Sequence, residues 1–320
     1  MAEFMRVENL KVHYPIRSGF LNRVTDHVYA VDGVSFSLEE GKTYGLVGES
    51  GSGKSTIGKA VIGLEKITSG NIYYEGQDVS KILRQRRSDY RRNVQMIFQD
   101  SLSSFNPKRR ITDILGEPLR NFTTMTPDEE RMKKLELLDI VGLSEEALLK
   151  YPHEFSGGQR QRIGVARAVA LNPKLIIADE PVSALDLSVQ AQVLNFMKHI
   201  QEAYNVSYLF VSHDLGVVKH MCDELAIMYR GRFTEYGTRQ DIYGDPQHIY
   251  TRRLLSAIPE MNPNNREQNK LNRLRVEKEY RQNAERYYDE NGRVYDLKPL
   301  TETHLVALKQ LDHSVKGGEM

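Results

Sequence analysis

A glycine-rich stretch at residues 48–55 (GESGSGKS) has the spacing G-x-x-x-x-G-K-[ST]. Its glycines let backbone N–H groups turn inward around a phosphate, where side chains would block them. Lys54 can reach the β- and γ-phosphates of a nucleotide, and the Ser55 hydroxyl can ligate Mg²⁺. A chance glycine-rich turn is the alternative, with odds of about one in a hundred in this length. The pattern predicts phosphate contacts from Gly48, Ser50, Gly51, Ser52, Gly53, Lys54, Ser55 and Thr56.

Two adjacent acids, Asp179 and Glu180, follow the apolar run of residues 175–178. Sheets of α/β proteins place their ligand chemistry at such strand ends. Asp179 is positioned to hold Mg²⁺ through water, and Glu180 could polarise an attacking water. A lone Asp-Glu pair after a strand is more often a helix N-cap. Together with the phosphate loop, the pair instead indicates nucleotide hydrolysis.

A third motif lies at Ser156, Gly157, Gly158 and Gln159. Ser156 and Gln159 fit the S-x-x-Q capping box at the start of a helix that runs to Leu171. The bare glycines also let this helix N-terminus present N–H groups and the Ser156 hydroxyl to an anion. The two interpretations are compatible.

Strands and helices must position these residues. Alternation of Val31, Val34, Phe36 and Leu38 predicts a strand within residues 28–45, and residues 44–47 form a buried strand that ends at Gly48. We expect a helix at residues 56–64. Residues 89–172 are predicted to be mostly helical. The helical pattern is interrupted by Pro107, Pro118, Pro127 and Pro152.

Two continuous apolar runs, residues 175–178 and 208–211, are typical of parallel strands covered on both faces. A helix at about residues 188–204 connects them. From residue 261 onward the chain is polar, with tyrosines but little apolar periodicity. We expect an appended tail with one surface helix near residues 266–286 and no core of its own, so that removal of residues after about Pro259 leaves the nucleotide site formed.

Composition excludes several classes of protein. The 320 residues are 40% hydrophobic and 27% charged, as in an ordinary globular protein, and 44 basic residues balance 43 acidic ones. Nothing predicts a nucleic-acid-coating surface, since the basic run at residues 84–92 fits a solvated face. No apolar run approaches the roughly 20 residues of a membrane span, and residues 1–10 do not resemble a signal peptide. The single cysteine, Cys222, allows neither an internal disulfide nor an iron–sulfur cluster, so we expect a cytoplasmic protein.

The ordered motifs resemble those of the ABC transporter ATPases over roughly residues 5–250. Residues 155–162 (FSGGQRQR) are similar to the family's signature motif, which contacts the γ-phosphate of an ATP bound to the partner chain. The resemblance implies that Gln99 senses Mg²⁺ and water, that residues 183–186 form the D-loop, and that His213 contacts the γ-phosphate. Tyr14 resembles the aromatic that stacks on adenine, although a lone aromatic near a strand is more often core.

The resemblance assigns three sets of site residues. Glu180, His213 and Gln99 are the expected catalytic residues, and Ser55, Gln99 and Asp179 the expected Mg²⁺ ligands. ATP is contacted in trans, from the facing subunit, by Ser156, Gly157, Gly158, Gln159 and Asp186.

Three stretches are similar to the oligopeptide and dipeptide importer branch: residues 30–51, residues 98–107 and residues 245–259. The tail around residues 295–304 resembles the F-type subunit of oligopeptide importers. That branch often carries a C-terminal cysteine group that binds a cluster. Cys222 alone departs from this pattern and is most simply a buried small residue.

The resemblance implies an α/β fold, a P-loop ABC-type nucleotide-binding domain with a mixed-sheet core. It would occupy residues 1–260, with a helical subdomain inserted at about 90–170 and a polar C-terminal extension at 261–320. The implied function is ATP hydrolysis, with Mg²⁺, that energises a membrane permease for oligopeptide import. Implied partners are a D-type ATPase subunit in a heterodimer, two permease subunits and, indirectly, an extracellular peptide-binding protein, with no nucleic acid. The expected location is the cytoplasmic face of the cell membrane, as a peripheral subunit.

Two alternatives remain. The same ATPase could serve import of dipeptides, nickel complexes or glutathione, because this subunit never touches the cargo. A non-transport ABC protein acting on ribosomes or DNA would normally have two fused ATPase halves or a long coiled-coil insertion, and this chain has neither.

Overall fold

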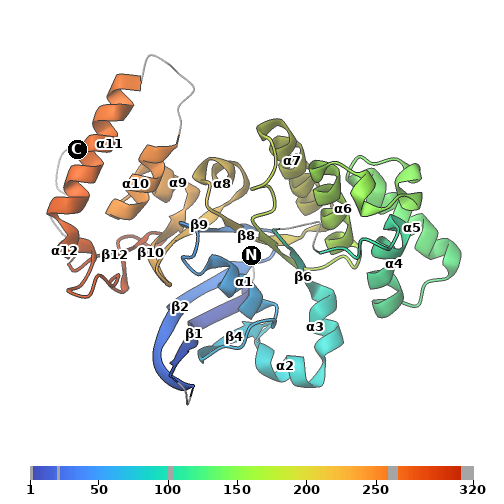
Figure 1. Ribbon diagram of the computed structural model, residues 1–320, viewed down its shortest axis with the longest axis horizontal. Coiled ribbons are helices and arrows are strands. Elements are labelled where there is room, and N and C mark those ends of the chain that lie inside the picture. Colours follow the sequence, from blue (N-terminus) through green and yellow to red (C-terminus); the bar gives the residue numbers. More distant parts are fainter. Residues whose placement is uncertain (1–2, 20–21, 100–103, 259–265, 311–320) are drawn as a thin grey trace. The chain divides into compact units, whose positions relative to one another are not determined.

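The computed structural model describes residues 3–19, 22–99, 104–258 and 266–310. They form two compact units. The first comprises Met1–Leu10, Ser35–Thr43 and Ser55–Ser212, and the second comprises Lys11–Val34, Tyr44–Lys54 and His213–Met320. The chain passes from one unit to the other within β1 (Glu3–Ser18), β2 (Arg23–Glu39), β3 (Thr43–Val47) and α1 (Lys54–Val61), and again between Ser212 and His213. Figure 1 labels β1, β2 and α1. The predicted boundary at about residue 260 lies outside the described residues.

Three parallel strands run through the first unit in the order β8-β7-β6. They are β6 (Val94–Ile97), β7 (Leu175–Asp179) and β8 (Ser207–Ser212), and every residue of β7 and β8 is buried. Burial on both faces explains their continuous apolar runs and confirms the predicted parallel strands. The connecting helix α7 (Leu187–Tyr204) confirms the predicted crossover.

The helical part of the first unit contains α4 (Ile111–Phe122), α5 (Pro127–Ile140), α6 (Gly157–Val169) and two 3₁₀ turns, η1 (Glu145–Leu149) and η2 (Pro152–Glu154). Both α4 and α5 pack against α6. Pro127 and Pro152 begin helical turns, as prolines without an N–H can, whereas Pro118 lies inside α4. The mostly helical expectation for residues 89–172 is wrong at β6. Its four residues are too few to show a period, and pairing with β7 decides their conformation.

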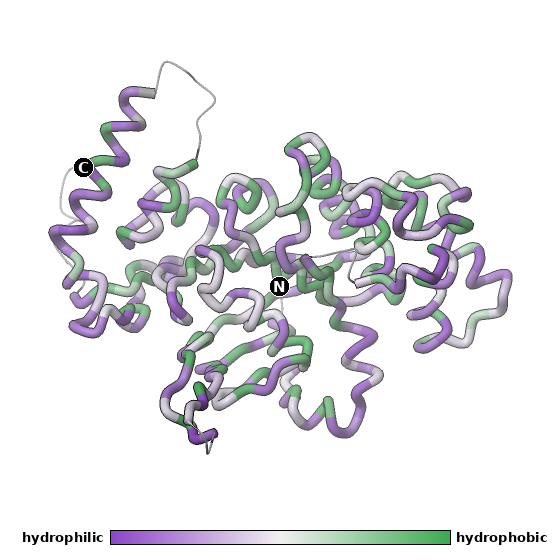
Figure 2. The backbone as a smooth tube through the Cα atoms, in the orientation of Figure 1, coloured by the Kyte–Doolittle hydropathy of each residue, from purple (hydrophilic) through white to green (hydrophobic). Residues whose placement is uncertain are grey.

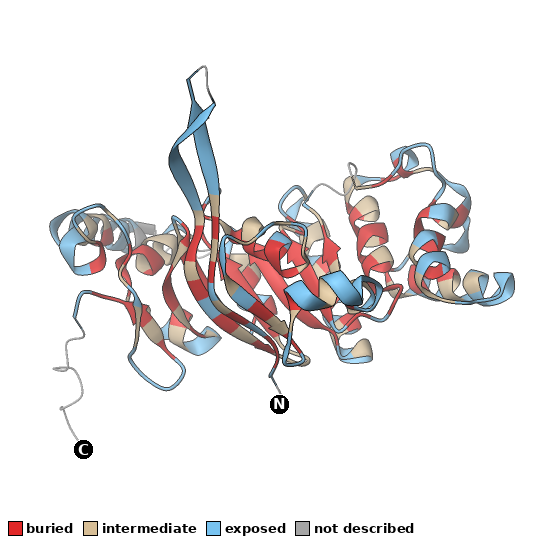
Figure 3. Cartoon of the chain, turned by 90° about the horizontal axis from the view of Figure 1, so that it is seen from below, coloured by how far each residue is buried: buried red, intermediate tan, exposed pale blue. Residues whose placement is uncertain are grey.

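A second, four-stranded sheet has the order β2-β1-β4-β5, with β4 (Ser69–Tyr74) and β5 (Gln77–Asp78) antiparallel to each other. The short helices α2 (Val79–Gln85) and α3 (Arg87–Asn93) follow β5. The predicted alternation is confirmed, because Val31, Val34, Phe36 and Leu38 are all buried. In the second unit, residues 14–18 of β1 and 23–29 of β2 are exposed (Figure 3).

The second unit contains strands in the order β11-β12-β10-β9-β3. β3 is parallel to β9 (Glu224–Tyr229), and β10 (Arg232–Thr238) is antiparallel to β9. Helices α8 (Leu215–Met221), α9 (Arg239–Gly244) and α10 (Ile249–Ala257) also belong to this unit. Cys222 is fully buried, as predicted, and burial raises the pKa of its thiol.

The C-terminal extension begins with the predicted surface helix, here α11 (Arg266–Gln282), along which most residues are hydrophilic (Figure 2). The chain then forms α12 (Ala284–Tyr287), β11 (Leu297–Pro299) and β12 (Leu305–Ala307). β12 pairs with β10, so the extension continues the sheet. Tail residues also share one buried apolar cluster with Ile249 of α10; they are Val276, Tyr287, Tyr288, Val294, Val306, Ala307 and Leu308.

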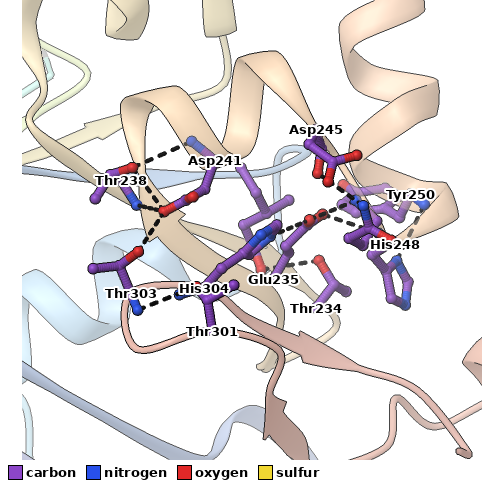
Figure 4. Close-up of polar contacts among 12 residues, drawn as sticks. Thr234, Glu235, Thr238, Asp241, Asp245, His248, Tyr250, Thr301, Thr303 and His304 are labelled. Carbon is purple, nitrogen blue, oxygen red and sulfur yellow. Dashed lines mark hydrogen bonds and ion pairs between the residues drawn. The ribbon is translucent and has the colours of Figure 1, made fainter. Parts of the chain in front are cut away.

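The expectation that the tail has no core is therefore wrong. Apart from Val276 in α11, its buried residues lie in turns, the four-residue helix α12 and the short strand β12, which are too short to show a helical or strand period. A buried ionic contact supports the same conclusion: His304 Nε2 lies 2.8 Å from Oε1 of Glu235, a fully buried carboxylate on β10 (Figure 4). Removal of the tail would leave this carboxylate without its histidine partner, which is costly in a buried position.

Candidate functional site

The predicted phosphate loop connects β3 to α1, and Lys54 is the first residue of α1. Lys54 is 4% exposed, and its Nζ donates to Gly48 O at 2.7 Å and to Glu49 O at 2.8 Å. A third contact, to Ser52 Oγ, is 3.4 Å. The ammonium thus lies inside the curve of its own loop, where it can meet an anion that the loop encloses.

Two glycines of this loop are required by close backbone contacts. A Cβ at Gly48 would lie 2.1 Å from Met228 O, and one at Gly53 would lie 1.9 Å from Ala30 O. Gly53 also has φ +107°, which side-chain-bearing residues rarely adopt. Gly51 differs, since its φ is +79° but a Cβ there would meet nothing within 4 Å. The open space at Gly51 leaves room for a ligand against the backbone. Ser50 is exposed on the loop, whereas Ser52 is buried.

The loop is also held by a residue that belongs to none of the sequence motifs. Tyr250 of α10 is 1% exposed, and its Oη accepts a hydrogen bond from Glu49 N at 3.1 Å. Burial raises the pKa of Tyr250 to about 12, so the phenol stays neutral at physiological pH. The sequence offered only the similarity of residues 245–259 to one transporter branch as a signal for this contact.

In the first unit, the Ser55 Oγ donates a hydrogen bond of 2.7 Å to Asp179 Oδ1. Asp179 ends β7 and is 5% exposed, while Ser55 and Thr56 lie half-buried in α1. The two residues predicted to share a metal ion are thus in direct contact. A hydroxyl and a carboxylate are oxygen donors of the kind that Mg²⁺ prefers.

Glu180 follows Asp179 and adopts φ +47°, in the left-handed region. Its backbone N donates to Val211 O at 3.0 Å, and its Oε2 accepts from Gln99 Nε2 at 3.0 Å. A glutamate in this conformation is strained, and such strain concentrates at functional sites. The structure therefore brings together two of the predicted catalytic side chains, Gln99 and Glu180.

Ser156 begins α6 with the predicted capping box. The Gln159 N donates to Ser156 Oγ at 3.3 Å, and Ser156 N donates to Gln159 Oε1 at 2.9 Å. A Cβ at Gly158 would lie 2.3 Å from Val189 Cγ1, whereas at Gly157 the nearest atom is 3.6 Å away. Gly158 is thus needed for packing on α7, and the role of this motif toward a partner chain stays a prediction.

The remaining predicted residues lie on separate elements. Asp186 is the N-terminal cap of α7, but its side chain makes no capping hydrogen bond. His213 directly follows β8 and is exposed. Tyr14 lies in β1 and is 38% exposed. The catalytic and adenine-stacking roles of these residues stay predictions.

Comparison with known proteins shows the family to which this chain belongs. A family model described as ABC transporter matches residues 31–183, and one described as oligopeptide/dipeptide transporter, C-terminal region, matches residues 234–288. The chain is 58% identical over 319 residues to the oligopeptide transport ATP-binding protein OppF of Lactococcus lactis subsp. lactis (strain IL1403), covering 100% of this chain and 98% of that protein. It is 48% identical over 260 residues to the dipeptide transport ATP-binding protein DppF of Escherichia coli (strain K12), covering 81% and 77%.

A solved dimer of the ATP-binding cassette MJ0796, bound to ADP and Pi, has a TM-score of 0.65 with this chain. The identity is 26%, and the match covers 73% of this chain and 98% of that one. Both the predicted fold class and the predicted family are thereby confirmed. The chain belongs to the ATP-binding proteins of ABC transporters, in the branch of the oligopeptide and dipeptide transporters.

Proposed function

We propose that this chain hydrolyses ATP to drive import of oligopeptides through a membrane permease. The observation that carries the proposal is the 58% identity to an oligopeptide transport ATP-binding protein along the whole chain, the C-terminal extension included. ATP hydrolysis is the activity of the family. The oligopeptide cargo is taken from the relative's name, and the family model at residues 234–288 supports the same branch.

The chain's own residues supply positioning and charge for phosphoryl transfer. Lys54, held by the carbonyls of Gly48 and Glu49, would contact the β- and γ-phosphates and offset their negative charge. Glu180, oriented by the amide of Gln99, would accept a proton from the attacking water. His213 would contact the γ-phosphate from the end of β8.

Ser55 and Asp179 fit a magnesium ion, because both present oxygen atoms and already lie 2.7 Å apart. We assign them, with Gln99, as its holders. The ion, when bound, supplies positive charge to the phosphate oxygens. Asp179 is 5% exposed, so its carboxylate acts in a setting where charge interactions are stronger than in water.

We further propose that the working unit is a heterodimer with a D-type ATPase, attached to two permease subunits on the cytoplasmic face of the membrane, with a peptide-binding protein outside. Ser156, Gly157, Gly158, Gln159 and Asp186 would complete the site of the facing chain. None of the described helices is long and apolar enough to cross a bilayer. The permease subunits would span the membrane.

Reconstitution tests this function. The complete importer in vesicles, with ATP inside, should take up labelled oligopeptides, and the complex with Glu180→Gln in this chain should take up fewer per unit time. Dipeptides and glutathione run in parallel decide between the cargoes. Uptake of dipeptides without oligopeptides would move the chain to the dipeptide function that its 48% identical relative is named for. ATP turnover that no peptide or permease influences would refute the transport role.

A further inference from the structure

The second unit contains a cavity of about 700 Å³ that no sequence motif predicts. Gly51 of the phosphate loop lies at one side. The other described residues of its lining come from β1 and β2, from residues 230–232 at the β9–β10 turn, and from a turn of the C-terminal extension, residues 291–294. The extension thus shares one cavity with the loop assigned to phosphate binding.

The turn of the extension is held in a fixed shape. Asp289 Oδ1 accepts hydrogen bonds from Asn291 N at 2.9 Å and Arg293 N at 2.8 Å, and Asp289 N donates to Arg293 O at 2.9 Å. Gly292 adopts φ +70°, which the tight turn requires. Tyr288 and Val294, on either side of the turn, form an antiparallel bridge and are buried.

A chain of hydrogen bonds joins this turn to the phosphate loop. The Arg293 guanidinium donates to Asp32 Oδ2 at 2.5 Å, and Asp32 N donates to Gly231 O at 2.8 Å. Gly231 N in turn donates to Ser52 O at 2.9 Å. A Cβ at Gly231 would lie 2.5 Å from Tyr29 O, so only glycine fits at this junction. Asp32 is buried and also lies 3.4 Å from His13 Nε2 and 3.9 Å from an Arg232 nitrogen.

The lining is chemically complementary to a nucleoside that carries phosphates. Among the described residues that line it, Asp32 is the one carboxylate, and four side chains are cationic: Lys11, Arg230, Arg232 and Arg293. An aromatic surface is present as well, since the rings of His13 and Tyr29 meet edge to face with centroids 4.6 Å apart, and Tyr29 is 53% exposed. Bases stack on such rings, and ribose and phosphate oxygens accept hydrogen bonds from cations.

We propose that the turn at residues 289–294 forms one wall of the pocket for the nucleoside end of ATP, and that Arg293 is its positioning residue. This inference rests on the ATP site proposed above. Arg293 ties the turn to Asp32, and Asn291 borders the space that the nucleoside occupies. Tyr14, assigned to adenine stacking by family resemblance, is not among the described residues that line this cavity.

The test compares ATP with inorganic tripolyphosphate, which carries the phosphates without the nucleoside. Asn291 is exposed, so Asn291→Trp fills the pocket without disturbing the fold. It should weaken ATP binding about tenfold or more, equivalent to about 1.4 kcal/mol, and leave tripolyphosphate binding unchanged. Arg293→Ala should act in the same direction, and Arg293→Lys, which keeps the charge, should recover part of the affinity. Both affinities are measured by titration calorimetry on the full chain.

Two matched controls accompany these variants. Asn283→Trp adds the same bulk at an exposed residue of the extension that does not line the cavity, and Arg281→Ala removes an exposed arginine of α11 that pairs with Glu277. Neither should change either affinity. Unchanged ATP affinity in Asn291→Trp, or equal losses of ATP and tripolyphosphate affinity, would show that the turn does not form a wall of the nucleoside pocket. Lys54→Ala tests the proposed ATP site separately. Unchanged binding of both ATP and tripolyphosphate in that variant would refute the ATP site itself.

Discussion

Lys54 shows how a single residue is prepared for its ligand. Its ammonium is buried and bound by two carbonyls of its own loop, so its position is set before any phosphate arrives. A preset cation loses little side-chain entropy on binding, and this favours affinity.

Replacement of Lys54 by alanine should therefore weaken ATP binding by about 2 kcal/mol, roughly 30-fold, the usual size of a lost charge-assisted contact. Titration of the purified chain with ATP measures it. Lys59→Ala is the matched control, since Lys59 lies exposed on the same helix. Equal affinities for the two variants would contradict the assignment of the loop to phosphate binding.

Glu180 should contribute to the chemical step and little to binding. Glu180→Gln keeps the size of the side chain and its place beside Gln99 but removes the charge that polarises water. Turnover should fall about a thousandfold, as for loss of a general base, with ATP affinity within a few-fold of the native value. Steady-state turnover and nucleotide titration are measured separately, with Glu202→Gln, at an exposed site on α7, as the control. Near-native turnover in the Glu180 variant would remove Glu180 from the base role.

At the scale of elements, β12 is joined to β10 by more than backbone pairing. Burial lowers the pKa of His304, but the hydrogen bond and charge of Glu235, together with Asp241 and Asp245, outweigh it, and the net pKa lies above the usual value. Thr303 Oγ1 also donates to Asp241 Oδ2 at 3.0 Å. These polar contacts join the extension to β10 through Glu235 and to α9 through Asp241.

This pairing predicts a pH dependence of stability. Because His304 has a raised folded-state pKa, its protonation stabilises the folded chain fully below the unfolded pKa, about 6.5, and the contribution disappears as pH rises through the folded pKa. Thermal unfolding of the full chain from pH 6 upward should show this loss. His304→Gln should be less stable at pH 6 and should have a flatter profile. If stability changed with pH to the same extent in the native chain and in His304→Gln, the His304–Glu235 pair would not contribute to the pH dependence.

At the scale of the whole molecule, the signature motif requires a second chain in our proposal. The capping box explains Ser156 and Gln159 locally, and packing on Val189 explains Gly158. Neither the capping box nor this packing explains why residue 157 is a glycine, since a Cβ at Gly157 would meet nothing closer than 3.6 Å. An approaching phosphate of a facing subunit would use that space.

Ser156→Arg tests the composite site in a heterodimer with the partner ATPase. The change should impair turnover at the site whose phosphate loop belongs to the partner, while Lys54 of this chain still binds ATP. Complexes with one mutated chain at a time, assayed by crosslinking of labelled ATP to each chain, separate the two sites. Loss of labelling on this chain alone would mean that the motif acts within its own chain, and the head-to-tail arrangement would be wrong.

The sequence by itself determined the phosphate loop, the strand-end acids and the capping box, because each is a local pattern of a few consecutive residues whose chemistry follows from type and spacing. It also predicted the buried parallel strands β7 and β8, since burial on both faces leaves continuous apolar runs. Its failure at β6 has the opposite cause, because four residues carry no period and only pairing with β7 decides their state.

Only the tertiary structure decided how the extension packs. Its contacts join residues far apart in the chain: His304 with Glu235, and Arg293 with Asp32. Such pairs leave no periodic signal, and a polar sequence with scattered tyrosines predicts a solvated tail. The free energy that fixes the extension comes instead from a few buried aromatic and ionic contacts, which exist only once the chain has brought their partners together.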